Sequence, residues 1–465
     1  MAKSTPEQLK FPPVDGMTVR ADFDGGALSA DFGPILLRGI DQHIGLTAAL
    51  ADAFHDTRHA SYIDHELRDL LAQRIYQMAC AYADGNDANS LRRDPMFKLA
   101  LERRPLDADN DLASAATFSR LENAATTKDI YRLGQAFVDQ FIASYAKPPP
   151  VIVLDMDHSE DHTHGQQELS FYNHHYRQHC YLPLFLFEGL SGKFITAALR
   201  TGKRPTGAEN AMVLRRVVQR LRQAWPDTHI VLRGDSHFAN PELMQLALDT
   251  SHCDFIFGLT GNAVLTPMAA PWVAATRAAH RDRCRLATAN GLPEPSSTRS
   301  YHALRYGAKT WPQDFRVILK AESMSLGDNP RWVVTSLQET DPAILYRELY
   351  CARGQDENYI KMIKNDLASD RTSDHRFLAN HMRLLFACGA YVLHQALRDE
   401  LLSHTELAKA QPSSVIVKLF KLAVKVVQYK DRIKLHLPSS CPVKHLLHKI
   451  TEILYLLPPP LCNSS

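Results

Sequence analysis

The sequence lacks the features that mark membrane, secreted and fibrous proteins. Its 465 residues contain no apolar run that approaches the ~20 residues of a transmembrane helix, and the start, MAKSTPEQLKFPP, shows no apolar segment typical of a secretory signal. The eight cysteines form no Cys-x-x-Cys pair, which favours reduced thiols in a cytosol over a disulfide or zinc framework. Internal repeats and low-complexity tracts are also missing. With 45% hydrophobic and 22% charged residues, the chain is typical of a globular protein of several packed units.

Charge is unevenly distributed, although the net charge is only +2. Residues 1–150 carry 16 Lys and Arg against 21 Asp and Glu, a balance of −5, whereas residues 151–465 carry 37 against 30, a balance of +7. Residues 401–465 alone hold nine basic and three acidic residues. One interpretation is a polyanionic partner for the later two-thirds of the chain. A solvated basic surface is the other.

The first part of the chain is predicted to be helical after an irregular start. Residues 1–40 are rich in Gly and Asp and predict an irregular arm, whereas residues 41–147 repeat apolar residues at a 3.6-residue period. A short basic helix within 90–106 followed by a Ser/Thr/Arg helix at 114–124 could be a helix-turn-helix-like DNA reader, or an ordinary helical hairpin. The prolines of 147–150 end this region.

The middle of the chain alternates between strands and helices. The predicted order over 151–260 is β-β-β-α-β-α-β, which implies an α/β unit with partly parallel pairing. Residues 261–340 contain three short strand-like runs and predict a β-rich insertion. Helical periodicity returns over 341–400, and 401–465 is predicted to be a small, basic α+β region.

Two of the predicted strands end in acids. Asp157 closes the first strand of the α/β unit, and Asp235 closes the fourth, in LRGDSHF. The crevice of an open α/β sheet lies outside the carboxyl ends of its strands, so neighbouring strands would bring these carboxylates together. Like charges at close range are costly unless a cation lies between them, and oxygen ligands favour Mg²⁺ or Mn²⁺ over zinc. The pattern predicts a metal site that needs a third acid.

The third acid comes from the helix predicted over 343–369. Four side chains of this helix fall within a ~60° sector of one face if each residue turns the helix by ~100°. They are Tyr350, Arg353, Glu357 and Lys364. A carboxylate between two cations suits a site that holds metal and phosphate together. The structural alternative is a solvated face stabilised by an Arg–Glu pair.

The spacing of these four residues, Y-x2-R-x3-E-x6-K, resembles the signature of one large branch of the DDE transposases of bacterial insertion sequences. LDMDHSEDHTHGQQE, in which Asp157 precedes Ser159 by two residues, resembles the strand of the first aspartate in that family. HIVLRGDSHF resembles the strand of the second aspartate, and a β-rich insertion before the third acid is a further likeness. The resemblance covers roughly residues 150–370, with a looser likeness at DANSLRRDPMFKLAL.

The resemblance implies a fold class: α/β, with an RNase H-like mixed sheet and flanking helices formed by 151–260 and 341–400. The β-rich insertion 261–340 would interrupt this core. A helical domain over 41–147 could bind DNA ends, and 401–465 would be the small α+β region.

The resemblance also implies an activity. A transposase of this kind would cut the ends of its insertion sequence and join them to target DNA by two-metal phosphoryl transfer, with two Mg²⁺ ions for which Mn²⁺ could substitute. Asp157, Asp235 and Glu357 would be the catalytic metal ligands, and Tyr350, Arg353, Lys364 and Trp332 would contact DNA. In similar enzymes a tryptophan near Trp332 holds a flipped base while a DNA hairpin forms, although a tryptophan packed in the β core is the other interpretation. The partners implied are the terminal inverted repeats, target DNA and a second copy of the chain, in a bacterial cytoplasm at the nucleoid and without a membrane.

The choice of the first acid stays open. Asp155 and Asp157 lie on the same face of the predicted strand, because alternate residues point the same way. Asp157 fits the acid-x-Ser/Thr pattern and lies further out, so it is preferred, with Asp155 in reserve. Glu160 and Asp161 are weaker candidates.

Histidines suggest a competing chemistry. Six of them cluster after the first strand: His158, His162, His164, His174, His175 and His179. A zinc hydrolase would use such ligands, but the spacing matches no zinc motif, and the six could instead line a DNA channel. A metal-dependent nuclease without strand transfer, and a DNA-binding regulator with an inactive core, are further alternatives.

The basic residues near the C-terminus predict a non-specific phosphate track. They are Lys418, Lys421, Lys425, Lys430, Arg432 and Lys434.

Overall fold

The structure is a computed structural model that describes residues 8–338 and 340–458. The chain forms two compact units, which we describe separately. The core unit comprises Ala125–Asn365 and Ser369–Cys388, and the flanking unit comprises the residues up to Ala124, Asp366–Ala368 and those from Gly389 onward. No helix among the described residues is long and apolar enough to cross a membrane.

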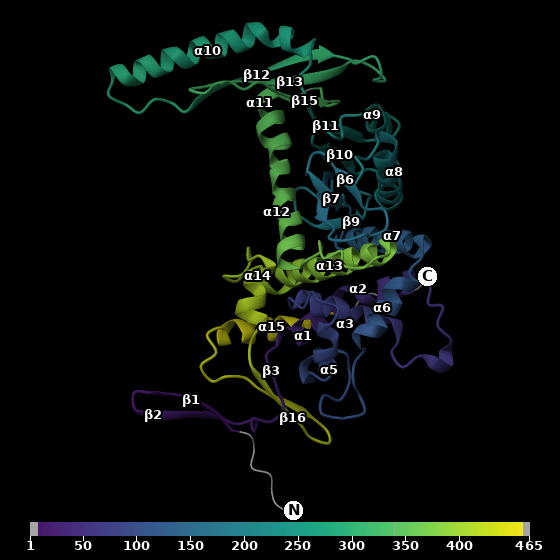
Figure 1. Cartoon of the computed structure of the whole chain (residues 1–465). Coiled ribbons are helices and arrows are strands. Elements are labelled where there is room, and N and C mark those ends of the chain that lie inside the picture. Colours follow the sequence, from purple (N-terminus) through teal and green to yellow (C-terminus); the bar gives the residue numbers. More distant parts are fainter. Residues whose placement is uncertain (1–7, 339, 459–465) are drawn as a thin grey trace, which may run out of the picture. The chain divides into compact units, whose positions relative to one another are not determined.

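A mixed sheet forms the centre of the core unit (Figure 1). Its strands are β4 (Val151–His158), β8 (Leu184–Glu188), β9 (Phe194–Ala198), β10 (His229–Gly234), β11 (Cys253–Leu259), β12 (Ser297–Tyr306), β13 (Phe315–Met324), β14 (Gly327–Asp328) and β15 (Arg331–Thr335). They lie in the order β12-β13-β15-β11-β10-β4-β8-β9, and β14 pairs with β13. β10 is parallel to β4 and β11, and every other pairing is antiparallel. The strands predicted in 151–260 are therefore confirmed.

Helices cover both faces of this sheet (Figure 1). α7 (Thr127–Ala143), α8 (Gly207–Ala224) and α9 (Pro241–Leu248) bury one face, where Leu154 and Leu232 belong to the large apolar core. α8 begins at a capping box between Thr206 and Glu209, in which side chains satisfy otherwise unpaired helix N–H groups. The opposite face carries a smaller apolar cluster that includes Val153.

That opposite face is covered by a nearly continuous helix whose winding changes along its length. It comprises α11 (Pro342–Ile344), a π-helical turn η2 (Leu345–Tyr350), a 3₁₀ turn η3 (Cys351–Gln355), α12 (Asp356–Lys361) and a second π-helical turn η4 (Met362–Asp366). Leu345 and Tyr346 pack on Val153 and Val231 of the sheet. A helix is confirmed here, but its four signature residues do not follow the uniform turn that the sequence analysis assumed. α13 (Phe377–Leu397) follows and confirms the helix predicted over 375–397.

The region between β11 and α11 differs from its prediction. Its three predicted strands are present as β12, β13 and β15, and β15 pairs with β11, so that they extend the central sheet. A long helix, α10 (Leu265–Ala289), was not predicted, because the whole of 261–340 was interpreted as a β-rich insertion. The helix forms because Ala and Arg residues after Pro271 favour it and because its inward side chains pack on β12 and β13.

A small separate sheet was also not predicted. β5 (Asp161–His162), β7 (Gln178–Tyr181) and β6 (Phe171–Asn173) pair in that order directly after β4. Their polar, histidine-rich sequence carries no period-2 apolar pattern from which strands could be recognised.

The flanking unit is mainly helical. Its helices are α1 (Gly33–Ile44), α2 (Leu46–Ala53), the 3₁₀ turn η1 (Ala60–Tyr62), α3 (Leu67–Ala79), α4 (Asp87–Leu91), α5 (Pro95–Ala100), α6 (Ala115–Ala124), the π-helical turns η5 (Arg398–Leu402) and η6 (Ile416–Phe420), α14 (Pro412–Val415) and α15 (Lys444–Leu456). A three-stranded sheet of β17 (Ile433–His436), β16 (Val424–Gln428) and β3 (Leu28–Ser29) completes it. The strands and the last helix predicted in 401–465 are present.

The predicted irregular arm contains regular structure. β1 (Leu9–Val14) and β2 (Met17–Ala21) form an exposed antiparallel hairpin, and α1 already begins at Gly33. Asp15 and Gly16 both have positive φ in the connecting turn, which is the conformation that an Asp-Gly pair favours between strands. Residues 1–7 of the predicted arm lie outside the described residues.

Of the two interpretations of 90–124, the compact helix-turn-helix arrangement is absent from this described segment. Residues 101–114 separate α5 from α6, whereas such a motif joins its helices by a turn of about 3–4 residues. The basic side chains are also engaged within the unit. Lys98 is buried and donates to the Asp107 carbonyl at 2.6 Å, and Arg93 pairs with Asp111 at 3.1 Å.

Candidate active site

The parallel register of β4 and β10 brings two polar pairs to the face beneath the helix of 342–366. Val153 pairs with Val231 and Asp155 with Arg233, so the next residues on that face are Asp157 and Asp235. Asp155 and Arg233 are fully buried and form an ion pair through two contacts, one of them 2.5 Å long. Arg233 also donates to the Leu349 carbonyl at 2.5 Å, which ties the sheet to the helix. Asp155 therefore has a partner inside the core.

Asp157 lies at the outer end of β4 and has a different environment. Its side chain is 20% exposed, and Arg353 Nη1 lies 3.5 Å from Asp157 Oδ2. Burial raises the pKa of Asp157 to about 7, and the carboxylates of Asp235 and Glu357 add to this rise, while Arg353 opposes it. Residues separated by up to 200 positions in the chain therefore interact electrostatically at one point.

Asp235 follows the last residue of β10 and borders a small cavity. Its Oδ1 accepts the backbone N–H of His237 at 2.9 Å. The cavity has a volume of about 220 Å³. It is lined by Asp235, Ser236, Gly258, Leu259, Thr260, Gly261, Pro330, Arg331, Trp332, Tyr346 and Tyr350. Trp332 is only 5% exposed and belongs to the large apolar core, so it packs in the β core and also contributes to the cavity wall.

Gly258 allows the helix and the strand ends to approach each other. A Cβ at this position would lie 2.6 Å from the Tyr350 hydroxyl and 2.9 Å from the Ser236 amide nitrogen. Burial raises the pKa of Tyr350, and Asp235 adds to the rise, while Arg353 opposes it. A side chain larger than glycine would therefore displace either Tyr350 or the segment that carries Asp235.

Arg353 connects the first and third predicted acids. Its Nη2 lies 3.4 Å from Glu357 Oε1, and its Nη1 contacts Asp157 at 3.5 Å. The Glu357 side chain is 50% exposed, whereas that of Arg353 is 18% exposed. The Arg353 guanidinium thus lies between two carboxylates and donates an N–H to that of Glu357.

Lys364 lies apart from this pair, because the winding changes between α12 and η4. Its Nζ donates to Ser159 Oγ at 3.1 Å and to the Glu160 carbonyl, and lies 3.7 Å from carboxylate oxygens of Glu160 and Asp161. Lys364 therefore holds the segment that follows β4, and its side chain is 14% exposed.

Sequence reasoning missed Asp356. This residue is fully buried, and neither carboxylate oxygen has a hydrogen-bond partner. Burial raises the pKa of Asp356 to about 8, and Asp155 and Asp157 add to the rise. No sequence signal identified it, because its place inside the cluster depends on the 3₁₀ turn before it.

A larger cavity of about 870 Å³ lies beyond Lys364. Its walls include Glu160, His162, His164, Lys364 and His375. The six histidines that suggested a zinc site do not all lie at this cavity: His162 and His164 line it, and the other four do not. The ring of His158 stacks on Phe238 at 5.1 Å, and His174 and His179 contact Tyr172 at 5.3 and 5.7 Å.

The acids fit a hard divalent cation in chemistry but not in spacing. Carboxylate oxygens are the ligands that Mg²⁺ and Mn²⁺ prefer. Burial raises the pKa values of Asp157 and Asp356, and neighbouring carboxylates, whose charge a cation would neutralise, add to the rise. No three His, Cys, Asp or Glu side chains in 8–338 and 340–458 are, however, close enough together to hold a metal ion. The structure instead places Arg353 between the carboxylates.

Comparison with known proteins adds one finding. The model of a family described as "Transposase DDE domain group 1" matches residues 11–459, which is nearly the whole chain. No curated protein matches the chain.

Proposed function

The chain belongs to the Transposase DDE domain group 1 family, and from this premise we propose that it cuts DNA at the ends of its insertion sequence and joins them to target DNA. The observation that carries this proposal is geometric: Asp157 and Asp235 stand at the carboxyl ends of adjacent parallel strands, and Arg353 links Asp157 to Glu357 of α12. Family membership makes the chain a DNA-cutting transposase in general terms. The chemistry that follows is our proposal.

We propose that the core unit is RNase H-like. Its first five long strands lie in the spatial order β9-β8-β4-β10-β11, with the first three antiparallel and the last three parallel. This sheet supports the proposal because it delivers Asp157 and Asp235 from adjacent parallel strands to one edge. β12, β13 and β15 would then be the insertion that interrupts the core.

Three carboxylates, Asp157, Asp235 and Glu357, are proposed to hold two Mg²⁺ ions, or Mn²⁺ in their place. Such a pair of ions, when bound, lowers the pKa of the attacking hydroxyl and stabilises the leaving oxygen of an in-line displacement. For these side chains to act as ligands, Arg353 would have to release Asp157 and Glu357. A DNA phosphate is the anion that would draw the guanidinium away, because Arg binds phosphate with paired N–H donors.

The remaining signature residues are proposed to position DNA. Tyr350 borders both Asp235 and the small cavity, and its hydroxyl could donate to the phosphate backbone beside the cut. Lys364 lines the larger cavity and is proposed to contact a phosphate there, in addition to holding Ser159. The histidines His162 and His164 on the same wall would serve as further hydrogen-bond donors.

The small cavity beside Asp235 is proposed to receive a flipped base. Trp332, Tyr346 and Tyr350 give it an aromatic wall, on which a nucleobase can stack. A base removed from the duplex at this point would permit excision through a DNA hairpin. The reaction would take place in a synaptic complex with a second copy of the chain, on chromosomal DNA in the bacterial cytoplasm.

The test uses duplexes that carry the DNA flanking the gene of this protein, with and without Mg²⁺. We expect nicks at the element ends with the unaltered chain and none with Asp235→Asn, although this variant should still bind the duplex. Asp227→Asn, an exposed aspartate at the other end of β10, is the matched control and should cleave normally.

Other outcomes identify the alternatives. Cleavage without strand transfer would show a nuclease, and specific binding without cleavage by the unaltered chain would show a regulator with an inactive core. Cleavage retained by Asp235→Asn would remove this residue from the site. Ester hydrolysis that depends on zinc would favour the zinc hydrolase.

A further inference from the structure

Four of the six basic residues predicted as a phosphate track lie on one β-hairpin, which we name the basic hairpin (Val424–His436). They are Lys425, Lys430, Arg432 and Lys434, and all four are exposed. Asp431 is the only acid in the segment, so its net charge is +3. The hairpin therefore concentrates positive charge on a short, projecting element (Figure 1).

The other two residues of the predicted track are placed differently. Lys421 is engaged inside the flanking unit, where its Nζ contacts the buried carboxylate of Asp31 at 2.7 Å and lies 3.8 Å from the ring centre of Tyr82. Lys418 is exposed, but it belongs to η6 and not to the hairpin. The continuous track expected from the sequence is therefore reduced to one local surface.

The two faces of the basic hairpin differ in character. Val424 and Val426 point inward and are buried. The register pairs Lys425 with His436 and Val427 with Lys434, so the opposite face carries the charges of the strands. Across the turn, Arg432 lies over the ring of Tyr429 at 4.7 Å, and the Tyr429 N–H donates to the Arg432 carbonyl at 2.8 Å.

The basic hairpin is fixed to the flanking unit at two points, through β3 at its base and through Gln428 beside its turn. β16 pairs with β3, and the Gln428 side chain donates to Asp107 Oδ1 at 2.8 Å and accepts from the Leu106 N–H at 3.0 Å. A hairpin held in this way loses little conformational entropy when it binds a ligand. These contacts also occupy Gln428, the one amide side chain of the hairpin. Amide side chains are the kind that reads adenine edges in DNA.

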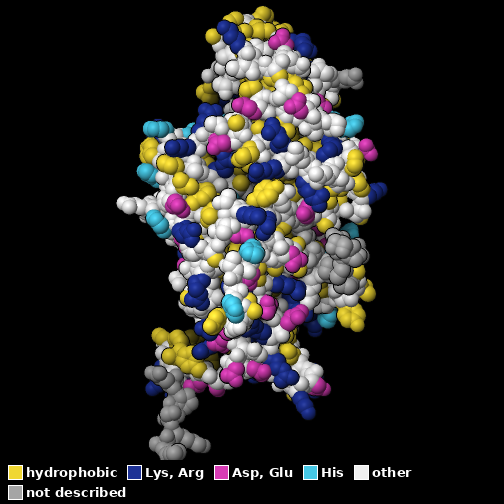
Figure 2. Space-filling model, turned by 90° about the vertical axis from the view of Figure 1, so that its right-hand side faces the viewer, with side chains coloured by type: hydrophobic (Ala, Val, Ile, Leu, Met, Phe, Trp, Pro, Cys, Tyr) yellow, Lys and Arg dark blue, Asp and Glu magenta, His cyan; other side chains and the backbone are white. Residues whose placement is uncertain are grey.

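We propose that the basic hairpin binds the sugar–phosphate backbone of duplex DNA without reading its sequence. Lys and Arg are the residue types that contact phosphate, and their placement on a rigid ribbon positions a duplex without specifying bases. Figure 2 shows a face of the molecule on which basic, acidic and apolar side chains are mixed. The inference rests on the proposed function only in taking DNA as the polyanion.

The test compares two variants of the full chain that lose the same charge from the flanking unit. Lys430→Gln/Lys434→Gln removes two charges from the hairpin, and Lys409→Gln/Lys444→Gln removes two exposed charges outside it. Binding to a labelled duplex of random sequence is measured by fluorescence anisotropy over a series of KCl concentrations without Mg²⁺. We expect the slope of log K against log[KCl] to fall by about 1.8 for the hairpin variant, which is two phosphate contacts at about 0.9 each, and to stay unchanged for the control.

A further variant separates charge from position. Gln428→Ala keeps all the charges but removes the contacts that hold the turn end of the hairpin, so it should weaken binding several-fold with an unchanged salt slope. An unchanged slope in the Lys430→Gln/Lys434→Gln variant, or an equal loss in the control, would overturn the inference.

The same assays keep this inference distinct from the proposed function. If the unaltered chain binds with the expected slope but never cleaves its own ends, the proposed function fails and the basic hairpin stands. If Asp235→Asn loses cleavage while the hairpin variant binds normally, the proposed function stands and the inference about the hairpin fails.

Discussion

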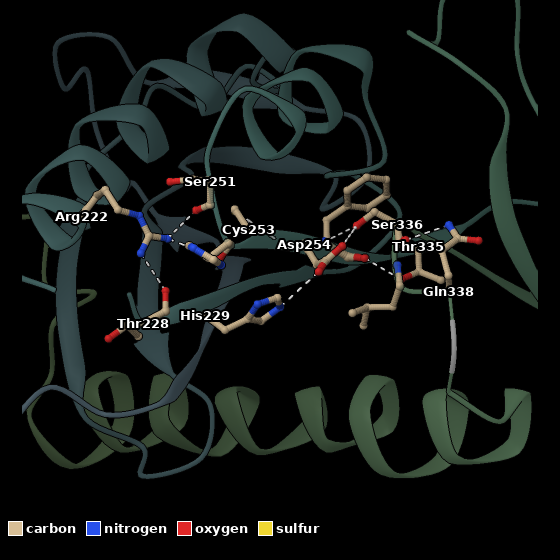
Figure 3. A network of polar contacts seen from close by, with 12 residues as sticks. Arg222, Thr228, His229, Ser251, Cys253, Asp254, Thr335, Ser336 and Gln338 are labelled. Atoms are coloured by element: carbon tan, nitrogen blue, oxygen red, sulfur yellow. Dashed lines mark hydrogen bonds and ion pairs between the residues drawn. The ribbon is translucent and has the colours of Figure 1, made fainter. Parts of the chain in front are cut away.

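Polar residues near the two ends of β10 and β11 differ in how well their charges and hydrogen bonds are satisfied. At the end where the strands begin, the Asp254 carboxylate contacts His229 Nε2 at 3.1 Å and accepts the Ser336 hydroxyl at 2.6 Å (Figure 3). Arg222 there donates to several backbone carbonyls, including that of Thr228 at 2.7 Å (Figure 3). Near the other end, Asp157 of the neighbouring strand β4 has a pKa raised to about 7, and Asp356 of α12 has a side chain without a hydrogen-bond partner.

This difference separates structural polar groups from candidate functional ones. A satisfied network such as that of Asp254 fixes the register of β15 on β11 and hence the start of the helix that carries Glu357. Buried carboxyls with strongly raised pKa values destabilise the fold, and they are characteristic of sites that bind a cation or perform chemistry. The comparison also distinguishes Asp155, which is paired with Arg233, from Asp157, which faces other acids.

The largest effect is expected from exchanging an aspartate at each end of the sheet. Asp235→Asn should reduce cleavage of element ends by about a thousandfold or more with little change in the melting temperature, because it removes a proposed metal ligand. Asp254→Asn should instead lower the free energy of unfolding by about 1 kcal/mol, because it weakens the contacts with the partly buried His229 and Ser336, and should keep most of the cleavage. Comparable cleavage by Asp235→Asn and Asp254→Asn would show that the two ends of the sheet do not differ in function.

The contribution of Asp157 to the stability of the chain should decrease as the pH rises. A carboxyl whose folded pKa is raised from 3.8 to about 7 keeps its proton longer in the folded state, so the folded state loses stability between these pH values. For Asp157 the loss amounts to at most about 4 kcal/mol at 1.36 kcal/mol per pKa unit. Urea unfolding in the presence of EDTA should show that the free energy of unfolding changes less with pH in Asp157→Asn than in the unaltered chain, between pH 4 and about 7. Identical pH profiles would mean that Asp157 is not in a charged, buried cluster.

A smaller effect is expected at Gly258. Gly258→Ala would place a Cβ 2.6 Å from the Tyr350 hydroxyl, so either the helix or the strand end must move. We expect cleavage to fall by about 10-fold to 100-fold, since misplacement of about 1 Å is costly in catalysis. Gly291→Ala, in which nothing lies within 4 Å of the new Cβ, is the control for the substitution itself. Because Gly291 has a positive φ, the melting temperature of this variant is measured as well, so that a loss of stability is not mistaken for a loss of activity. Full activity of Gly258→Ala would show that this approach is unimportant.

The smallest effect is expected for Lys364. Lys364→Met should reduce the salt slope for DNA binding by about 0.9, the value for one phosphate contact. Lys361→Met removes an exposed charge from the same helix and should leave the slope unchanged. If Lys364→Met changes only the melting temperature, this lysine serves to hold Ser159 and Glu160 in place.

Much of the core could be predicted because its local patterns agree with its tertiary structure. β4 and β10 are apolar runs that end in acids, and α8 is marked by the capping residue Thr206 and by Pro226. The hairpin near the N-terminus had a usable signal in Asp15-Gly16 that the sequence analysis did not apply. α10 was missed because the strand-like runs after it led the whole of 261–340 to be interpreted as β-rich.

The site could be predicted only in part. The sequence identifies Asp157 and Asp155 as sharing one face, but their different partners follow from the parallel register that brings Arg233 opposite Asp155. Lys364 turns away from Arg353 and Glu357 because the helix winds through 3₁₀ and π-helical turns, which a regular 3.6-residue period does not describe. The same departure brings Asp356 into the cluster.

Iron-directed cleavage of the polypeptide would test most directly whether the three acids form one site. Fe²⁺ that replaces Mg²⁺ in the DNA-bound chain produces hydroxyl radicals with ascorbate and peroxide, and these cut the backbone near the bound ion. We predict fragments that end near Asp157, Asp235 and Glu357 together, all suppressed by excess Mg²⁺. Cuts confined to the histidine-rich segment of 158–179, or cuts near only one of the three acids, would contradict the account.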